Sequence, residues 1–226
     1  IQQQRQLLKT LDSNPQFFNP SQQSQQQQQS LDASSVFGLV FIVRTKVDES
    51  IQFTGFEFYT TPTAESHLFY ELYAKEGEFW ETADVLGGGT VLGGLDTFDL
   101  ISQGVTQGSG NCTETFQDTA LYCSLAVVPE EGFIQSQWTI SEELSSRTFY
   151  ITLSSKNLVA QSSNPTQLAD GRVVASTPEL ELYEGIGTKT HPFSNNREYY
   201  YDTPMGFIGK IHYNDDSQLV PPAPRP

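Results

Sequence analysis

The chain has 226 residues and carries 27 acidic against 12 basic side chains, which gives a net charge of −15. Binding to nucleic acid or to an anionic membrane surface depends on clustered Lys and Arg, so this charge argues against both partners. We interpret the acidity as a solubility feature, with binding of Ca²⁺ or of a cationic partner as the alternative.

Residues 1–35 form a Gln-rich arm whose composition differs from that of the rest of the chain. A tract of this kind has too few apolar side chains to order itself. Leu7, Leu8 and Leu11 have the spacing of one short helical stripe. We predict that the arm contacts a neighbouring subunit; the alternative is that it packs along its own domain.

Residues 36–214 are predicted to form one β-rich domain, because short apolar runs recur there with the period of two that strands show. Gly55 interrupts the alternation between Phe53 and Phe56, where a β-bulge would keep the aromatic side chains of both halves on one face. The expected strands cover residues 36–43, 51–60, 67–74, 97–105, 133–140, 147–153, 158–160, 172–175, 179–183 and 207–213.

Two glycine-containing segments connect the early strands. Residues 75–78, with Gly77, are predicted to turn the chain from the strand at 67–74 into Phe79 and Trp80 as a hairpin. Residues 85–96 contain five glycines, but no G-K-[ST] sequence follows them. We therefore predict a surface loop there and not a phosphate-binding loop.

The two cysteines, Cys112 and Cys123, lie in one local segment that reads as two strand ends joined by a turn. This spacing suits a disulfide that closes a hairpin, and the alternative is two reduced, buried thiols. Asn111 begins the one N-x-[ST] glycosylation sequon of the chain. Together the disulfide and the sequon indicate a secreted, extracellular protein.

Short strands separated by Gly, Asn and Pro turns, without a convincing helix in the body, predict an all-β fold. We expect a two-sheet β-sandwich of jelly-roll type with an extended Gln-rich N-terminal arm. Residues 215–226 are expected to be a Pro-rich tail. No apolar run reaches the roughly 18 residues that a membrane-spanning helix needs, so no membrane span is predicted.

The chain offers no residue pattern that predicts catalysis. His67, His191 and His212 lie far apart in the sequence and lack metal-ligand spacing. Glu179 and Glu181 share one face of a strand, as a pair of glycosidase carboxylates could, but outward-facing acids on an exposed sheet explain them equally. We therefore predict a protein that is not an enzyme.

No cofactor is expected, and Ca²⁺ is the alternative that the sequence suggests. Acidic residues lie at the ends of two predicted strands, where hard oxygen ligands on loops would suit this ion. The alternative is that these loops are simply solvated, because no EF-hand pattern is present. The candidate ligands are Asp96, Asp99, Asp215 and Asp216.

Three adjacent tyrosines, Tyr199, Tyr200 and Tyr201, occupy the loop before the last strand. Neighbouring side chains in one segment cannot all face one core, so at least one ring is expected on the surface. An exposed ring can stack on a sugar or anchor a protein partner. The alternative is that the three rings fold under and cover the end of the domain.

Residues 36–214 resemble a secreted domain, often repeated in tandem, of predicted diatom and other stramenopile proteins. The segments that carry the resemblance, in order, are GFEFYT (55–60), AKEG (74–77), RTFYITL (147–153), STPELELYEGIG (176–187), HPF (191–193) and GFIGKIHY (206–213). This chain departs from the pattern in its Gly-rich loop, its Cys112–Cys123 segment and His191, where that family favours Tyr. The resemblance implies an extracellular or cell-surface, modular protein and transfers no functional residue.

These observations predict a non-enzymatic structural subunit of an extracellular or cell-surface assembly, such as a filament. Neighbouring subunits would make contact through the N-terminal arm, which could add a strand to an exposed sheet edge. The alternative is a carbohydrate-binding module that uses exposed aromatic side chains.

Overall fold

The computed structural model describes residues 9–13, 33–47, 51–61, 67–78, 97–107, 113–116, 119–127, 139–140, 145–162, 172–191 and 200–215. Within these ranges the chain forms β-strands and no α-helix, which confirms the all-β prediction. The strands are β1 (Lys9–Asp12), β2 (Ala33–Val36), β3 (Gly38–Thr45), β4 (Ile51–Thr60), β5 (His67–Glu76), β6 (Asp99–Gln107), β7 (Thr113–Phe116), β8 (Thr119–Val127), β9 (Thr139–Ile140), β10 (Ser146–Leu153), β11 (Leu158–Ser162), β12 (Val173–Ser176), β13 (Leu180–Thr188), β14 (Tyr200–Phe207) and β15 (Gly209–Asp215).

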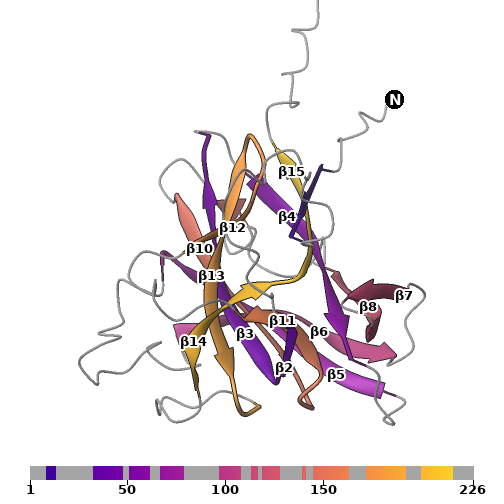
Figure 1. Cartoon of the computed structure of the whole chain (residues 1–226). Helices are drawn as coiled ribbons and strands as arrows, with labels where there is room; N and C mark the ends of the chain where they lie inside the picture. The colour runs from indigo at the N-terminus through magenta and orange to yellow at the C-terminus, as the bar shows by residue number, and fades with distance from the viewer. Residues whose placement is uncertain are drawn as a thin grey trace, which may run out of the picture.

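The strand pairs are antiparallel and link into one sheet in the order β1-β15-β4-β11-β14-β13-β3-β10-β5-β6 (Figure 1). The other strands join this path from the side: β2 on β11, β12 on β13, β8 and β9 on β4, and β7 on β8. β11 connects the group β1-β15-β4 to the group β14-β13-β3-β10-β5-β6. Its pairing with β4 consists of one residue pair, Leu158 and Thr60. The described strands therefore form a continuous network, and the two-sheet jelly-roll arrangement stays a prediction.

Strand β3 explains why residues 36–43 read as an almost unbroken apolar run. Leu39, Phe41 and Val43 point into the main hydrophobic core, while Val40 and Ile42 belong to a second buried cluster on the opposite face. Since successive side chains of a strand point to opposite faces, both faces of β3 need apolar residues. The second cluster also contains Tyr73, Phe98, Tyr150, Tyr183 and Ile186.

The predicted bulge in β4 is confirmed. In the antiparallel pairing of β15 with β4, His212 lies opposite Gly55, and the next residue, Tyr213, lies opposite Phe53. Thr54 therefore has no partner in β15 and is the extra residue of the bulge. The bulge restores the phase of the side chains, and Ile51, Phe53, Phe56 and Phe58 are all buried in the main core.

Aromatic rings from strands that do not pair with each other meet in the main core. Phe56 of β4 lies 4.9 Å from Phe149 of β10 and 6.3 Å from Phe41 of β3, measured between ring centroids. Phe41 also stacks on Phe207 of β14 at 4.7 Å. Burying each such ring contributes about 1.5–3 kcal/mol, so these contacts are a main source of stability.

Two predicted connections fall partly outside the described residues. Gly77 has a φ of 75°, which suits the predicted turn after β5, but Phe79 and Trp80 are not among the described residues. Both edges of β5 pair with other strands, β10 and β6. The Gly-rich segment 85–96 also lies outside the described residues, as does most of the predicted strand 133–140.

The N-terminal arm contributes to the sheet. β1, which lies within the range predicted as the arm, runs along β15 at one end of the strand order (Figure 1). Leu11 is therefore part of a strand and not of the predicted helical stripe. This segment forms a strand because the edge of β15 that β4 does not occupy can pair with it, whereas an isolated helix of this length is not stable in water.

Candidate functional site

The docking of β1 on β15 is the feature that relates most directly to the predicted assembly. Lys9 pairs with Tyr213, Thr10 with His212, Leu11 with Ile211 and Asp12 with Lys210. Leu11 is only 1% exposed and belongs to the main core, although the strand that carries it has four residues. This short strand thus fills a place in the core of the domain.

An ion pair holds the first residue of β1. The Lys9 Nζ donates a hydrogen bond of 2.7 Å to Glu179 Oε1, and the Tyr213 hydroxyl donates one of 3.1 Å to Glu179 Oε2. The hydrogen bond from Lys9 is the largest cause that lowers the pKa of Glu179 below its ordinary value, and partial burial opposes it. Glu179 therefore links β1 to the segment before β13 as a charged carboxylate.

Ser13, directly after β1, closes the other end of the contact. Its hydroxyl donates to the Gly209 carbonyl oxygen at 2.9 Å and accepts from the Gly209 amide at 3.0 Å. A Cβ on Gly209 would lie 2.0 Å from the Glu57 carbonyl oxygen, so only glycine fits there. Gly209 therefore contacts β4 on one side and forms hydrogen bonds with Ser13 through its backbone.

His212 lies between β1 and β4. Its Nδ1 is 3.2 Å from Thr10 Oγ1, and its Nε2 is 3.9 Å from Glu57 Oε2. Burial is the main cause that lowers the pKa of His212, with a contribution from Lys210, while Glu57 raises it. The neutral imidazole is therefore favoured where β1 is docked.

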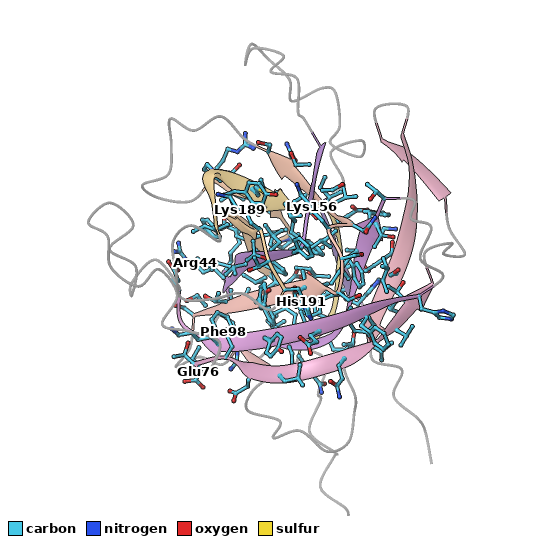
Figure 2. All side chains as sticks on the ribbon, turned by 90° about the horizontal axis from the view of Figure 1, so that it is seen from below. Arg44, Glu76, Phe98, Lys156, Lys189 and His191 are labelled. Atoms are coloured by element: carbon cyan, nitrogen blue, oxygen red, sulfur yellow. The ribbon has the colours of Figure 1, made fainter. Side chains whose placement is uncertain are left out.

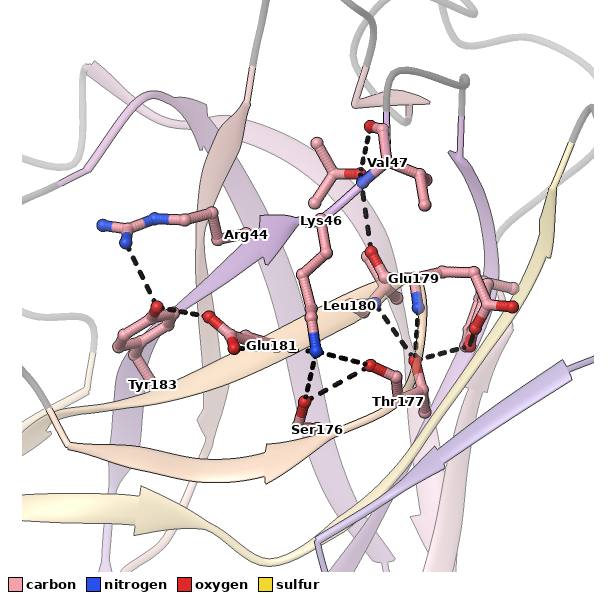
Figure 3. A network of polar contacts seen from close by, with 11 residues as sticks. Arg44, Lys46, Val47, Ser176, Thr177, Glu179, Leu180, Glu181 and Tyr183 are labelled. Atoms are coloured by element: carbon pink, nitrogen blue, oxygen red, sulfur yellow. Dashed lines mark hydrogen bonds and ion pairs between the residues drawn. The ribbon is translucent and has the colours of Figure 1, made fainter.

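A polar network continues from Glu179 across β3, β12 and β13 (Figure 3). Lys46 Nζ donates to Ser176 Oγ and to the Thr177 carbonyl oxygen, both at 3.1 Å. The Tyr183 hydroxyl donates to Glu181 at 2.6 Å and accepts from Arg44 at 3.1 Å. Glu179 and Glu181, the carboxylate pair noted in the sequence, each accept hydrogen bonds from a tyrosine and lie near a lysine.

The predicted cysteine hairpin agrees with the described strands. β7 and β8 pair antiparallel, with Thr113 opposite Tyr122. Cys123 is disulfide-bonded, and Cys112 is the other cysteine of the sequence. Cys112 and the sequon residue Asn111 lie outside the described residues.

The candidate Ca²⁺ ligands can be located only in part. Asp99 is exposed at the start of β6, and Asp215 ends β15, although its side chain is not described. Asp96 and Asp216 lie outside the described residues. Among the side chains that the structure describes, no three of His, Cys, Asp or Glu gather as a metal site would require.

Of the three predicted platform tyrosines, the structure describes only the side chain of Tyr201. Tyr201 is half-buried and packs against the main core. Lys156 Nζ and Lys189 Nζ lie 5.8 Å and 5.4 Å from the centre of its ring. Sequence reasoning missed both lysines, because neither is near Tyr201 in the chain.

Comparison with known proteins adds no relative: the chain matches no family model, no curated protein and no solved structure. The resemblance to the stramenopile domain therefore stays a prediction. In the part of the chain that the structure describes, there is no helix with the length and apolar character to cross a membrane.

Proposed function

We propose that this protein is a non-enzymatic structural subunit of an extracellular or cell-surface assembly, in which β1 of one copy pairs with β15 of the next. The observation that carries the proposal is the docking of the arm segment 9–13, which combines strand pairing, a buried Leu11 and the Lys9–Glu179 ion pair. These contacts need only β1 and the site formed by β15, Glu179 and the core, so β1 of a second copy could make them equally well.

The connection between β1 and β2 is long enough for such an exchange. Residues 14–32 separate Ser13 from Ala33, and nineteen residues can span at most about 65 Å when extended. Exchange of an identical element between copies is a low-cost route to oligomers, because it creates no new interface type. If each copy donates its β1 to the next copy and the copies do not close into a ring, they form a filament.

The free energy gained when β1 docks on β15 is small, so the strand can detach. Burial of Leu11 contributes about 1.5–3 kcal/mol, and a partly exposed ion pair such as Lys9–Glu179 about 0.2–1 kcal/mol. Ordering each backbone residue costs about 1–2 kcal/mol, so five residues nearly offset these gains and those of the strand hydrogen bonds. A segment tethered to its own site meets it at an effective concentration of the order of millimolar. Exchange is therefore expected in concentrated protein.

The wider features of the proposal have separate support. The disulfide at Cys123 and the sequon at Asn111 favour an oxidising, extracellular location. The tilted ring contacts of Phe56 with Phe41 and Phe149, which join strands that do not pair with each other, support the two-sheet sandwich of jelly-roll type as the finer description of the fold. Hydrogen bonds from tyrosines to Glu179 and Glu181 support a structural use of these carboxylates.

The first test compares the full chain with a chain that lacks residues 1–30. Light scattering after gel filtration, over a concentration series up to millimolar, should show concentration-dependent oligomers only for the full chain. Circular dichroism should show that the shortened chain remains β-rich. Polymerisation of the shortened chain, or a full chain that stays monomeric throughout, would rule out the proposal.

A charge-reversal pair then tests exchange between copies. Lys9→Glu and Glu179→Lys each place like charges across the β1 contact within one chain. In an equimolar mixture, exchange restores the opposite charges only between chains, so the mixture should form more oligomer than either variant alone. The double variant in one chain should behave like the natural sequence. Equal association of the mixture and the single variants would contradict exchange.

A further inference from the structure

Two lysines from different turns lie near one aromatic ring, that of Tyr201. Lys156 follows β10, Lys189 follows β13, and Tyr201 is at the start of β14. The two ammonium groups lie 5.8 Å and 5.4 Å from the ring centre, within the range of a cation–π contact. Figure 2 labels both lysines, which lie next to each other in that view.

The charge of these two lysines is unusual within this acidic chain. The described residues include nine Lys and Arg side chains, of which six lie within 4.0 Å of a carboxylate oxygen. Among those described, Lys75, Lys156 and Lys189 have no such carboxylate, although acidic residues outnumber basic ones 27 to 12. Two of the three share one ring, so two cations meet there without a carboxylate oxygen within 4.0 Å of either among the described residues.

Hydrogen bonds hold the two turns in place. Asn157, next to Lys156, donates from Nδ2 to Thr61 Oγ1 at 2.9 Å, and the Thr61 amide donates to the Asn157 carbonyl oxygen at 2.9 Å. His191, two residues after Lys189, has its Nδ1 3.0 Å from Thr152 Oγ1. The backbone that carries each lysine is therefore fixed before any ligand arrives.

The ring itself is fixed by the core on one side. Tyr201 packs against the main core, and a Cβ on Gly187 would lie 3.0 Å from its Cδ2 atom. Tyr201 is only half-buried, and the two flexible lysine side chains lie over its ring. An aromatic surface held in this way can stack on the C–H face of a sugar without loss of side-chain freedom.

We propose that Tyr201, Lys156 and Lys189 form a binding site for an acidic saccharide, a sugar that carries carboxylate or sulfate groups. Two like charges held near one ring repel each other, and an anion between them removes that repulsion. The partly exposed ring adds apolar contact that a sugar can use and a small inorganic anion cannot. The site is independent of the proposed assembly function and lies on other elements than β1 and β15.

Binding should be measured on the full chain with three defined probes, by isothermal titration calorimetry at low and at physiological salt. The probes are a heparin-derived oligosaccharide, which is sulfated, an oligogalacturonate, which is carboxylated, and cellohexaose, which is neutral. We expect at least one acidic probe to bind, with affinity that falls as salt rises, and cellohexaose not to bind. The preferred acidic probe identifies the anionic group.

The variants Lys156→Gln and Lys189→Gln should each weaken binding of the acidic probe about threefold to fivefold. Lys75→Gln is the matched control, because Lys75 also lies 5.8 Å from an aromatic ring, that of Phe98, and changes the net charge equally. It should leave binding unchanged. Tyr201→Ala should weaken binding further, and Tyr201→Phe, which keeps the ring and fills the same place in the core, should retain most of it.

Several results would overturn this proposal. They are the absence of binding of either acidic probe at millimolar concentration, equal loss in the Lys75 control, and binding of cellohexaose as tight as that of the acidic probes. Inorganic sulfate that binds as tightly as the saccharide would show a plain anion site instead. Unfolding curves of each variant separate loss of the site from loss of the fold.

Discussion

At the scale of single residues, backbone contacts determine where the chain requires glycine. A Cβ on Gly185 would lie 1.6 Å from the Val40 carbonyl oxygen, at the register shift where β13 gains a residue relative to β3. Rotation of a side chain cannot relieve such a contact, since the backbone of residue 185 fixes the position of its Cβ and the Val40 oxygen is itself a backbone atom. The bulge therefore brings β3 and β13 together only when residue 185 has no side chain.

Gly185→Ala should consequently lower the free energy of unfolding by at least the 1–3 kcal/mol or so that overpacking usually costs. Urea unfolding followed by circular dichroism measures this change. Gly206→Ala is the control, because its Cβ would meet the side-chain atoms of Val174 at 3.3 Å, and these can move. Similar stability of Gly185→Ala and the natural sequence would show that the two strands can separate at little cost.

At the scale of elements, two titrating side chains contribute to the attachment of β1, Glu179 and His212. Glu179, with its lowered pKa, stabilises the docked strand above its ordinary pKa of 4.5, and this contribution is lost as the pH falls through the lower folded value. His212 also has a lowered pKa, so its protonation below its ordinary value of 6.5 opposes the docked state. Both effects weaken docking in the same direction.

We therefore expect β1 to detach as the pH falls from about 6.5, where His212 begins to oppose docking, to below 4.5, where the contribution of Glu179 is lost. Hydrogen exchange of the β1 amides, measured at several pH values and corrected for intrinsic exchange, should show loss of protection before the core strands β3 and β10 lose theirs. His212→Asn should remove the part of the change near pH 6, and replacement of the exposed His67 by Gln should not. Protection of β1 that stays constant over this pH range would contradict the expectation.

At the scale of the whole molecule, the last strand holds distant parts of the chain together. β15 pairs with β1 on one edge and with β4 on the other, so residues 9–12, 51–58 and 209–215 form one unit. Ile211 and Tyr213 of β15 are buried in the main core. Loss of β15 would therefore remove the neighbour of both strands as well as core side chains.

A chain that ends at Ile208 should fail to fold, whereas a chain that lacks residues 1–13 should fold with reduced stability. The reason is that β1 contributes one core side chain from a sheet edge, while β15 is an interior strand. Near-ultraviolet circular dichroism and thermal unfolding distinguish the two outcomes. A cooperative unfolding transition in the chain that ends at Ile208 would show that β4 and the rest of the sheet need no support from β15.

The sequence by itself determined the all-β class, the approximate strand positions and the bulge beside Gly55. These features depend on side-chain alternation within a single segment, and that alternation can be read without knowing the neighbouring strands. It also indicated the cysteine hairpin, whose strands β7 and β8 are adjacent in the chain.

Only the tertiary structure decided which edge β1 occupies and which side chains meet around Tyr201. Lys9 and Glu179 are 170 residues apart, and the lysines near Tyr201 come from two different turns. Pairing between distant strands depends on which edges the rest of the fold leaves open, and a local pattern does not contain this information. The helical spacing of Leu7, Leu8 and Leu11 was therefore misleading, because an open edge of β15 determines the conformation around Leu11.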